Sequence, residues 1–355
     1  VEARDNLKLW SGGLTTLKVA DIIEETPEVK TFRLVGEQPL LFSYQPGQFI
    51  TFMMEIDGRE VQRSYSMSSS PSRPHTLDVT VKRIPGGLVS NWLCDTVRLG
   101  DRLKIRGPSG KFTCFQYPSD KLLLIAAGSG VTPVISMARW IVDTAATVDV
   151  KQLASFRSPP DIIFRRELEW MSARHNGLQV ALTVTSSWRG SEGWTGLTGR
   201  INRPMIALLA PDFQDRHIFM CGPEAFMADV RAVLRELDYD LAKLHSESFG
   251  TGRVAQGITP APPALDLGGP LHQVRFTQSG LSVTTGEHVT LLELAEAHGI
   301  EIDYSCRSGN CGECMVKCRG AVALDRGCEI SADEQAKGWV YACSSRARSD
   351  LEIDA

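Results

Sequence analysis

Apolar and polar residues alternate along the first third of the chain, from Leu14 to about Phe115. Residues 31–34 and 77–82 show the two-residue period, in which successive side chains point to opposite faces of a strand. Glycines and prolines interrupt the alternation at several points, among them residues 85–87. This pattern predicts an antiparallel β-barrel or sandwich.

The pattern changes at about residue 121, where apolar runs begin to alternate with amphipathic stretches. The runs at 122–127, 180–184 and 217–220 have the length of buried strands. The last run leads into a stretch whose apolar residues fall on one face of a helix. Those residues are Phe226, Val230, Val233 and Leu237. Strands followed by helices predict an α/β domain with a parallel sheet.

Residues 251–270 are rich in proline and glycine and lack apolar periodicity, which is typical of a linker. Beyond it, the runs at 274–276 and 281–283 predict a hairpin, and 290–298 predicts a short helix before a cysteine-rich loop.

A chain of 355 residues is too long for one ordinary hydrophobic core, so several domains are expected. We expect a β-barrel domain at 1–116, an α/β domain at 117–250, the linker at 251–270 and an α+β domain at 271–355.

Composition narrows the class of protein further. With 43% hydrophobic and 23% charged residues and a formal net charge of −4, the chain lacks the features of a disordered or nucleic-acid-binding protein. No apolar run approaches the length of about 20 residues that a membrane-spanning helix needs. No secretory signal is evident, although the chain begins with valine and we expect a few residues to precede it. We expect a cytoplasmic protein.

The cysteines suggest a metal site, because six of the nine lie between Cys306 and Cys343. Four of them have the C-x4-C-x2-C…C spacing of a plant-type [2Fe-2S] site. The four predicted ligands are Cys306, Cys311, Cys314 and Cys343. Gly309 and Gly312 suit a loop that wraps closely around a cluster.

Two alternatives remain for these cysteines. One is a structural zinc site, although zinc sites usually pair two short C-x2–4-C hooks. The other is that Cys318 or Cys328 supplies the fourth ligand, although ordinary packing is the expected role of both.

A candidate flavin site follows an apolar strand of the first domain. Arg63-Ser64-Tyr65-Ser66 offers a cation suited to phosphate, a ring suited to stacking and hydroxyls suited to polar ring atoms. Gly87-Leu88-Val89-Ser90 opens a helical stretch, and a helix N-terminus can receive a pyrophosphate. The alternative for the first segment is a solvated serine-rich turn.

A candidate nucleotide site follows two strands of the second domain. The first strand ends at the glycine turn Gly128-Ser129-Gly130, with Thr132 and Pro133 opening the next helix. The second strand ends at Cys221-Gly222-Pro223, again before a helix. A strand, a glycine turn and a helix start form an arrangement that accepts a dinucleotide pyrophosphate.

Together these motifs resemble the ferredoxin-NADP reductase family, in particular FAD reductases with a C-terminal plant-type ferredoxin domain of β-grasp fold. By this resemblance Arg63 binds flavin phosphate, Tyr65 stacks on the isoalloxazine and Ser66 approaches its N5. Residues 87–90 hold the pyrophosphate of FAD, with FMN as the alternative flavin.

The resemblance also implies roles in hydride transfer. Cys221 lies beside the nicotinamide, and Phe249, in Glu247-Ser248-Phe249, covers the flavin face that the nicotinamide must reach. NADH is the favoured donor. NADPH would need cations for its 2′-phosphate, and the candidates are Arg157, Arg189 and Arg200.

The three motifs predict an NAD(P)H:acceptor oxidoreductase. Hydride delivers two electrons and a [2Fe-2S] cluster accepts one, so a flavin is needed to convert between them. The chain is similar to reductase components of Rieske-type oxygenases, such as those that demethylate glycine betaine, and a terminal oxygenase is the expected acceptor. Alternatives are a reductase of hybrid-cluster protein or of another multicomponent monooxygenase, or a non-catalytic electron carrier or redox sensor.

Overall fold

The structure is a computed structural model that describes residues 7–186, 193–249 and 268–355, except 301, 303, 305, 306, 308, 310, 311, 326, 327 and 329. The chain forms two compact units, one of residues 1–56 and 64–249 and one of residues 57–63 and 250–355. Most of the predicted linker, residues 251–267, lies outside the described residues, and so does Arg189. The domain boundaries remain a prediction.

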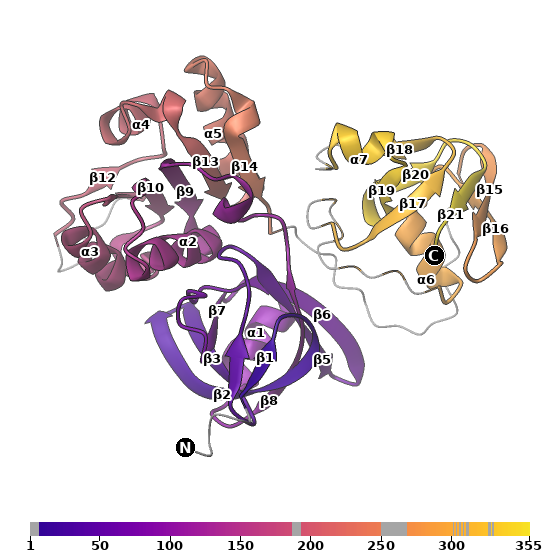
Figure 1. The fold of residues 1–355 in the computed structure, drawn as a ribbon, viewed down its shortest axis with the longest axis horizontal. Coiled ribbons are helices and arrows are strands. Elements are labelled where there is room, and N and C mark those ends of the chain that lie inside the picture. Colours follow the sequence, from indigo (N-terminus) through magenta and orange to yellow (C-terminus); the bar gives the residue numbers. More distant parts are fainter. Residues whose placement is uncertain are drawn as a thin grey trace. The chain divides into compact units, whose positions relative to one another are not determined.

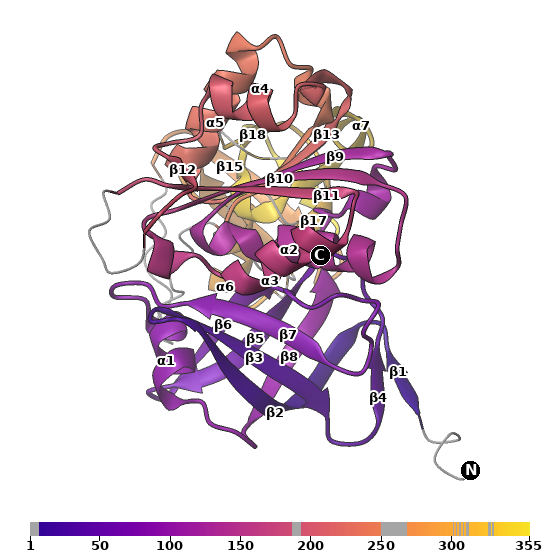
Figure 2. The same ribbon diagram turned by 90° about the vertical axis from the view of Figure 1, so that its left-hand side faces the viewer.

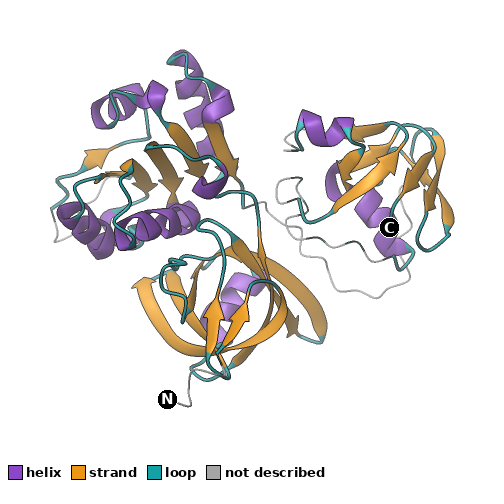
Figure 3. Cartoon of the chain, in the orientation of Figure 1, coloured by secondary structure: helices purple, strands orange, loops and turns teal. Residues whose placement is uncertain are grey.

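The N-terminal part is a curled antiparallel sheet with one helix packed beside it (Figure 3). The order of its six strands is β6-β5-β8-β2-β3-β7. The elements are β2 (Gly13–Thr26), β3 (Val29–Gly36), β5 (Phe49–Ile56), β6 (Arg59–Ser66), β7 (Leu77–Lys82), α1 (Leu88–Thr96) and β8 (Arg102–Ser109). The two edges of the sheet meet at a bridge between Met67 and Val79, so the sheet curls into a barrel. A short parallel pair, β1 (Lys8–Trp10) and β4 (Leu40–Phe42), lies outside this sheet.

The two-residue period explains these strands. In β3 the side chains of Phe32 and Leu34 are fully buried, whereas Arg33 between them is half-buried and pairs with Asp78 of β7. One face of the sheet therefore forms the core of the barrel, as the alternation predicts. The predicted antiparallel barrel is confirmed.

The second part is a parallel sheet with helices on both faces, which confirms the predicted α/β domain. The strand order is β12-β11-β10-β9-β13-β14. The strands are β9 (Lys121–Ala127), β10 (Asp149–Phe156), β11 (Leu178–Val184), β12 (Leu197–Thr198), β13 (His217–Cys221) and β14 (Leu244–Glu247). The helices are α2 (Val131–Asp143), α3 (Arg165–Arg174), α4 (Arg203–Leu209) and α5 (Glu224–Glu236).

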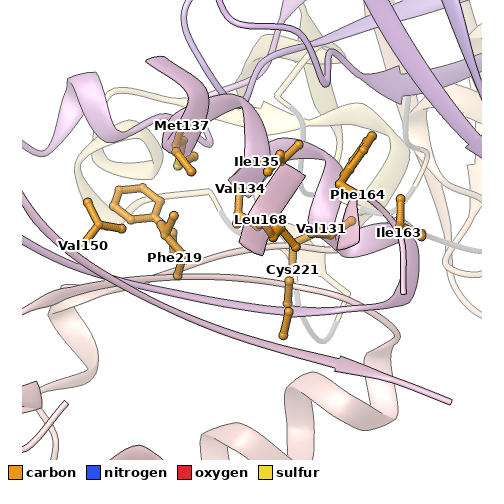
Figure 4. Packing of buried hydrophobic residues seen from close by; sticks show 14 of the residues in the cluster. Val131, Val134, Ile135, Met137, Val150, Ile163, Phe164, Leu168, Phe219 and Cys221 are labelled. Atoms are coloured by element: carbon orange, nitrogen blue, oxygen red, sulfur yellow. The ribbon is translucent and has the colours of Figure 1, made fainter. Parts of the chain in front are cut away.

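Each face of this sheet has its own apolar core. Figures 1 and 2 show α2 and α3 on one face, α4 and α5 on the other, and α2 between the sheet and the barrel. Figure 4 shows the first core, in which Phe219 and Cys221 of β13 lie among Val131, Val134 and Met137 of α2. The sheet is therefore buried on both sides, as its continuous apolar strands require.

The strand order reverses between β9 and β13. The helix after β9 lies on one face of the sheet and the helix after β13 lies on the other, so the carboxyl ends of these two strands form the switch point of the sheet. In doubly wound sheets this switch point is where ligands bind.

At the amino ends of the strands, opposite the switch point, a fully buried arginine, Arg216, links neighbouring strands. Its guanidinium donates to the carbonyls of Leu122 (3.2 Å) and Asp149 (2.9 Å) and to the carboxylates of Asp149 and Asp212. Hydrogen bonds from Arg216 lower the pKa of Asp212 from 3.8 to about 2, so this carboxylate is ionised at neutral pH. Arg216 therefore ties the amino ends of β9 and β10 to the segment that enters β13.

The C-terminal part is an α+β domain with a mixed sheet of strand order β16-β15-β21-β17-β19. Its elements are β15 (Leu271–Phe276), β16 (Ser282–Gly286), α6 (Leu291–Ala297), β17 (Met315–Arg319), β18 (Val322–Leu324), α7 (Ala332–Ala336), β19 (Trp339–Tyr341), β20 (Ser345–Ala347) and β21 (Leu351–Ile353). The predicted hairpin is β15 and β16, and the predicted helix is α6. Thr290 caps α6 in a capping box with Glu293, which explains where the helix begins. The expected β-grasp fold is confirmed.

Among the described residues, no helix combines the length and the apolar character that crossing a bilayer requires.

The Arg216 contacts lead to a prediction about stability. Arg216→Met removes the buried guanidinium from two carbonyls and from two carboxylates, which keep only their pairs with Lys121 and Lys151. We therefore expect unfolding of the first unit to become easier by about 3 kcal/mol. The matched control is Arg102→Met, which breaks an exposed pair with Glu37 and should cost less than about 1 kcal/mol. Urea unfolding followed by circular dichroism measures both. Equal effects of the two variants would contradict the role of Arg216.

Candidate functional site

The candidate nucleotide site lies at the switch point, where β9 and β13 end side by side. Gly128 follows β9 with φ +53°, in the left-handed region that favours glycine. A Cβ atom on Gly130 would lie 2.2 Å from the carbonyl oxygen of Cys221, so only glycine permits this approach. The hydroxyl of the buried Thr132 donates to the carbonyl of Ser129 (3.0 Å) and fixes the turn. The two sequence motifs, one at the end of β9 and one at the end of β13, therefore lie in direct contact at one site.

A pocket of about 280 Å³ opens beside this turn. Its walls come from the carboxyl ends of β7, β9 and β10, from residues just beyond β11 and β12, and from the first turns of α5. Lys82, the last residue of β7, brings its ammonium nitrogen within 3.8 Å of the position that a Cβ on Gly128 would occupy. The barrel thus contributes a cation to the pocket of the α/β domain.

Two arginines of the pocket are the described candidates for contact with a 2′-phosphate. Arg157, just after β10, pairs with Asp161, and Arg200, just after β12, pairs with Asp229. Both arginines were predicted from the sequence, whereas neither of their partners was. The spacing of Arg157 and Asp161 was the available signal, because residues four apart can pair within one turn.

The candidate flavin segment, Arg63-Ser64-Tyr65-Ser66, forms the end of β6. The Tyr65 and Phe52 ring centroids lie 5.9 Å apart. The Ser64 hydroxyl hydrogen-bonds with that of Thr51 (2.8 Å), and Ser66 is buried. The structure therefore presents these side chains from one strand with a fixed backbone.

The loop after β6 is held by α2 of the neighbouring domain. The hydroxyl of Ser136 donates to the carbonyl of Ser69 (2.6 Å), and the guanidinium of Arg139 donates to the carbonyl of Ser68. Arg139 also forms an ion pair with Glu167 of α3. These contacts fix the end of β6 relative to the parallel sheet.

The second candidate flavin segment begins α1, as predicted. Gly87 is its N-cap, and no side chain of the described residues caps the helix, which leaves the first N–H groups for a ligand. A Cβ on Gly87 would lie 2.5 Å from the hydroxyl oxygen of Ser90, so the turn is closely packed. Leu88 is half-buried, whereas Val89 and Ser90 are buried. This helix start has the geometry of a pyrophosphate cradle.

Glu247 connects the flavin segment to the nucleotide segment, although the sequence analysis assigned it no role. Its carboxylate accepts a hydrogen bond from Ser66 (3.4 Å), and its backbone pairs with that of Cys221 across β13 and β14. Cys221 is fully buried, and burial, with the charge of Glu247 as a second cause, raises the pKa of its thiol. The thiol therefore stays protonated at neutral pH. Ser66 and Cys221, predicted from separate motifs, are brought to the same place by Glu247.

The other members of the nucleotide segment lie close by. A Cβ on Gly222 would meet the ring of Phe226 at 2.7 Å, and Pro223 is the N-cap of α5. Phe249 follows Glu247 by two residues, with 38% of its surface exposed. A large exposed aromatic side chain beside this site is suited to covering a flat ring.

The candidate cluster site is described at two of its four cysteines. Cys314 and Cys343 are both buried, and the backbone N–H of Cys343 donates to the sulfur of Cys314 (3.4 Å). Cys306 and Cys311 lie outside the described residues. Gly309 and Gly312 have φ values of +78° and +79°, and a Cβ on Gly309 would lie 2.7 Å from the hydroxyl oxygen of Ser344. Buried thiols and a tight glycine loop fit an iron-sulfur cluster.

The two remaining cysteines of this domain differ in their surroundings. Cys318 lies on β17 within the apolar core, where burial raises the pKa of its thiol to about 11. Cys328 is half-buried, and its sulfur accepts a hydrogen bond from the hydroxyl of Ser344 (3.2 Å). Cys318 thus has the environment of a packing residue.

Comparison with known families agrees with this arrangement. The profile described as an oxidoreductase FAD-binding domain matches residues 16–114, that of an oxidoreductase NAD-binding domain matches 124–232, and that of a 2Fe-2S iron-sulfur cluster binding domain matches 274–348. The chain thus contains domains for FAD, NAD and a [2Fe-2S] cluster.

Similar proteins share the whole architecture. The chain is 40% identical to the glycine betaine monooxygenase reductase subunit of Pseudomonas aeruginosa strain UCBPP-PA14, covering 97% of this chain and 96% of that protein. It is 34% identical to the stachydrine N-demethylase reductase subunit Stc4 of Rhizobium meliloti strain 1021, covering 98% of each. The crystal structure of phthalate dioxygenase reductase covers 97% of this chain and 98% of its own, with a TM-score of 0.57 and 23% identity, which is a likeness of fold.

A flavin barrel, a nucleotide-binding parallel sheet and an iron-sulfur domain in one chain define a three-domain electron-transfer reductase. The chain belongs to the family of oxygenase reductases that includes the glycine betaine monooxygenase reductase subunits.

The close approach at Gly130 leads to a second prediction. Gly130→Ala forces the ends of β9 and β13 apart, because the added Cβ would strike backbone. We expect a stability loss of about 1–3 kcal/mol and at least a tenfold slower reduction of the flavin by nicotinamide nucleotide, with flavin content retained. Gly12→Ala is the control, since its Cβ would meet no atom closer than 3.7 Å. Unchanged reduction in Gly130→Ala would show that this approach does not shape the site.

Proposed function

We propose that this chain carries electrons from a nicotinamide nucleotide through FAD to its [2Fe-2S] cluster and then to a Rieske-type oxygenase. The observation that carries the proposal is the Ser66–Glu247–Cys221 connection, which joins the flavin segment of the barrel to the switch point of the parallel sheet. A cytoplasmic location is part of the proposal, because NAD(P)H is available there.

Separate sets of residues bind the flavin and the nicotinamide nucleotide. Arg63 pairs with flavin phosphate, Tyr65 stacks on the flavin ring, Ser64 supports this strand end, and residues 87–90 bind the pyrophosphate with the N–H groups of α1. On the nucleotide side, Gly128, Ser129, Gly130, Thr132 and Pro133 form the pyrophosphate turn. Lys82 neutralises the bound phosphates from the barrel side, and Gly222 and Pro223 leave room for the nicotinamide.

Hydride transfer depends on side chains that orient the two rings. When bound, FAD accepts a hydride and releases electrons singly, and the cluster carries one electron at a time. The hydroxyl of Ser66 donates to Glu247 and would lie beside a bound flavin ring, and the protonated thiol of Cys221 would line the nicotinamide side. Phe249, which is 38% exposed, would cover a bound flavin ring and exclude water from it.

The cluster is bound by four cysteine thiolates in this proposal. Cys314 and Cys343 are buried, and the N–H bond to the Cys314 sulfur stabilises the thiolate form. Cys306 and Cys311 complete the set by spacing.

The acceptor is proposed from the relatives. The two similar proteins are reductase subunits of a glycine betaine monooxygenase and of a stachydrine demethylase, and both of these substrates are quaternary ammonium compounds. We therefore propose an oxygenase that demethylates a substrate of this kind.

An anaerobic titration tests the electron path. We expect a nicotinamide nucleotide to bleach the flavin band and the iron-sulfur band of the purified, cofactor-replete chain. A Cys343→Ala variant should lose the cluster band and keep the flavin response, because residues 64–66 and 87–90 of the flavin segments lie in the other unit. Bleaching of neither band in the wild-type chain by NADH or NADPH would refute the reductase function.

A variant of Ser66 tests the proposed geometry. Ser66→Ala removes the hydroxyl that bonds to Glu247 and that we propose lies beside the flavin ring. We expect flavin reduction to slow about tenfold or more, because a hydrogen bond that orients the site is lost. Flavin content and the affinity for oxidised nucleotide should stay within about threefold. Stopped-flow absorbance measures the rate, with Ser172→Ala on α3 as a control that removes a hydroxyl elsewhere in this unit. A wild-type rate in Ser66→Ala would remove Ser66 from the mechanism.

A further inference from the structure

The pocket beside the glycine turn carries more charge than a pyrophosphate site needs. Lys82, Arg157 and Arg200 are cationic, and Asp161 and Asp229 are anionic. Each arginine has a carboxylate partner. The Nε and Nη2 atoms of Arg157 both lie 3.2 Å from oxygens of Asp161, and Nη1 of Arg200 lies 2.7 Å from an oxygen of Asp229.

The two pairs differ in how firmly they are held. The side chain of Asp161 is 21% exposed, and its carboxylate also accepts a hydrogen bond from Ser158 (2.5 Å). Burial alone would raise the pKa of Asp161, but the bonds from Ser158 and Arg157 outweigh it and lower the pKa. The two arginines are similarly exposed, Arg157 at 74% and Arg200 at 80%, but Asp229 is 51% exposed, so solvent screens its carboxylate more than that of Asp161. Asp161 is therefore the fixed negative charge of the pocket.

The position of Asp161 relates it to one part of a bound dinucleotide. A pyrophosphate at the turn after β9 places the adenosine ribose over the neighbouring strand. That strand is β10, which pairs with β9 and ends at Phe156, directly before Arg157. A carboxylate beyond the end of this strand can accept hydrogen bonds from ribose hydroxyls, whereas a 2′-phosphate brings a charge of about −2 to the same place.

We propose that Asp161 makes the pocket selective for NADH over NADPH. It occupies the guanidinium of Arg157, which would otherwise bind a 2′-phosphate, and it presents its own charge to the ribose. The charge of Lys82 does not offset the preference for NADH, because Lys82 lies at the glycine turn, where NADH and NADPH carry the same pyrophosphate. The inference rests on the proposed function for its physiological meaning.

The test is the change in selectivity caused by Asp161→Asn. We expect the wild-type chain to have a kcat/KM at least tenfold higher with NADH than with NADPH, measured with ferricyanide as acceptor at fixed ionic strength. Asp161→Asn keeps the shape of the side chain, removes its charge and releases Arg157. We expect kcat/KM for NADPH to rise about tenfold. A second change, Arg157→Gln, in the Asp161→Asn background should abolish that gain.

A binding measurement separates selectivity from catalysis. Isothermal titration calorimetry of the full chain compares 5′-AMP with adenosine 2′,5′-bisphosphate, which differ only in the 2′-phosphate. We expect Asp161→Asn to strengthen binding of the bisphosphate about tenfold relative to 5′-AMP. Glu37→Gln, which removes a carboxylate from an exposed pair with Arg102, is the matched control and should leave the ratio unchanged.

The outcomes are distinguishable. Equal or better use of NADPH by the wild-type chain would overturn the inference and leave the reductase function standing, and so would an unchanged binding ratio in Asp161→Asn. A shifted binding ratio in a chain whose flavin neither nucleotide reduces would support the selectivity of the pocket and refute the proposed function.

Discussion

The contact between α2 and the loop after β6 determines how the two halves of the active site meet. Hydride transfer requires reacting atoms about 3–3.5 Å apart, so a flavin bound to the barrel and a nucleotide bound to the parallel sheet must be held in one geometry. Arg139 and Ser136 provide this by donating to the carbonyls of Ser68 and Ser69, just beyond Ser66. The charge of Arg139 is balanced by Glu167, and its guanidinium lies 4.7 Å from the ring centroid of Phe164. Because the arginine is buried, water screens these bonds poorly, which strengthens the contact between α2 and the loop after β6.

Local patterns were sufficient to predict the fold of each part. Alternation predicted the barrel, buried apolar strands followed by helices predicted the parallel sheet, and glycines with positive φ, such as Gly128, marked turns that other residues disfavour. Cysteine spacing predicted the iron-sulfur domain. In each case the signal lies within one short segment, because the constraint acts on neighbouring residues.

The residues that connect the segments could not be predicted in this way. Glu247 acts through its pairing with Cys221 and its bond from Ser66, which is 181 positions away in the sequence. Arg139 looks like an ordinary polar residue of an amphipathic helix until the loop after β6 is placed against it. Both roles arise from strand register and domain packing, which a pattern within one segment does not contain. Asp161 is the intermediate case: its spacing from Arg157 permits an ion pair, but it was not predicted from the sequence, and only the fold shows the pocket that both residues line.

The choice among the cysteines of the last domain shows the same dependence on register. Spacing alone left Cys318, Cys328 and Cys343 as candidates for the fourth ligand. The pairing of Met315 with Tyr341 across β17 and β19 brings the residue before Met315, Cys314, close to Cys343, and the N–H of Cys343 bonds to the Cys314 sulfur. Cys318, farther along β17, pairs with Ile353 and belongs to the apolar core, where a thiolate would be poorly solvated. The β17–β19 register therefore places Cys343 beside Cys314, whereas β17 holds Cys318 in the apolar core.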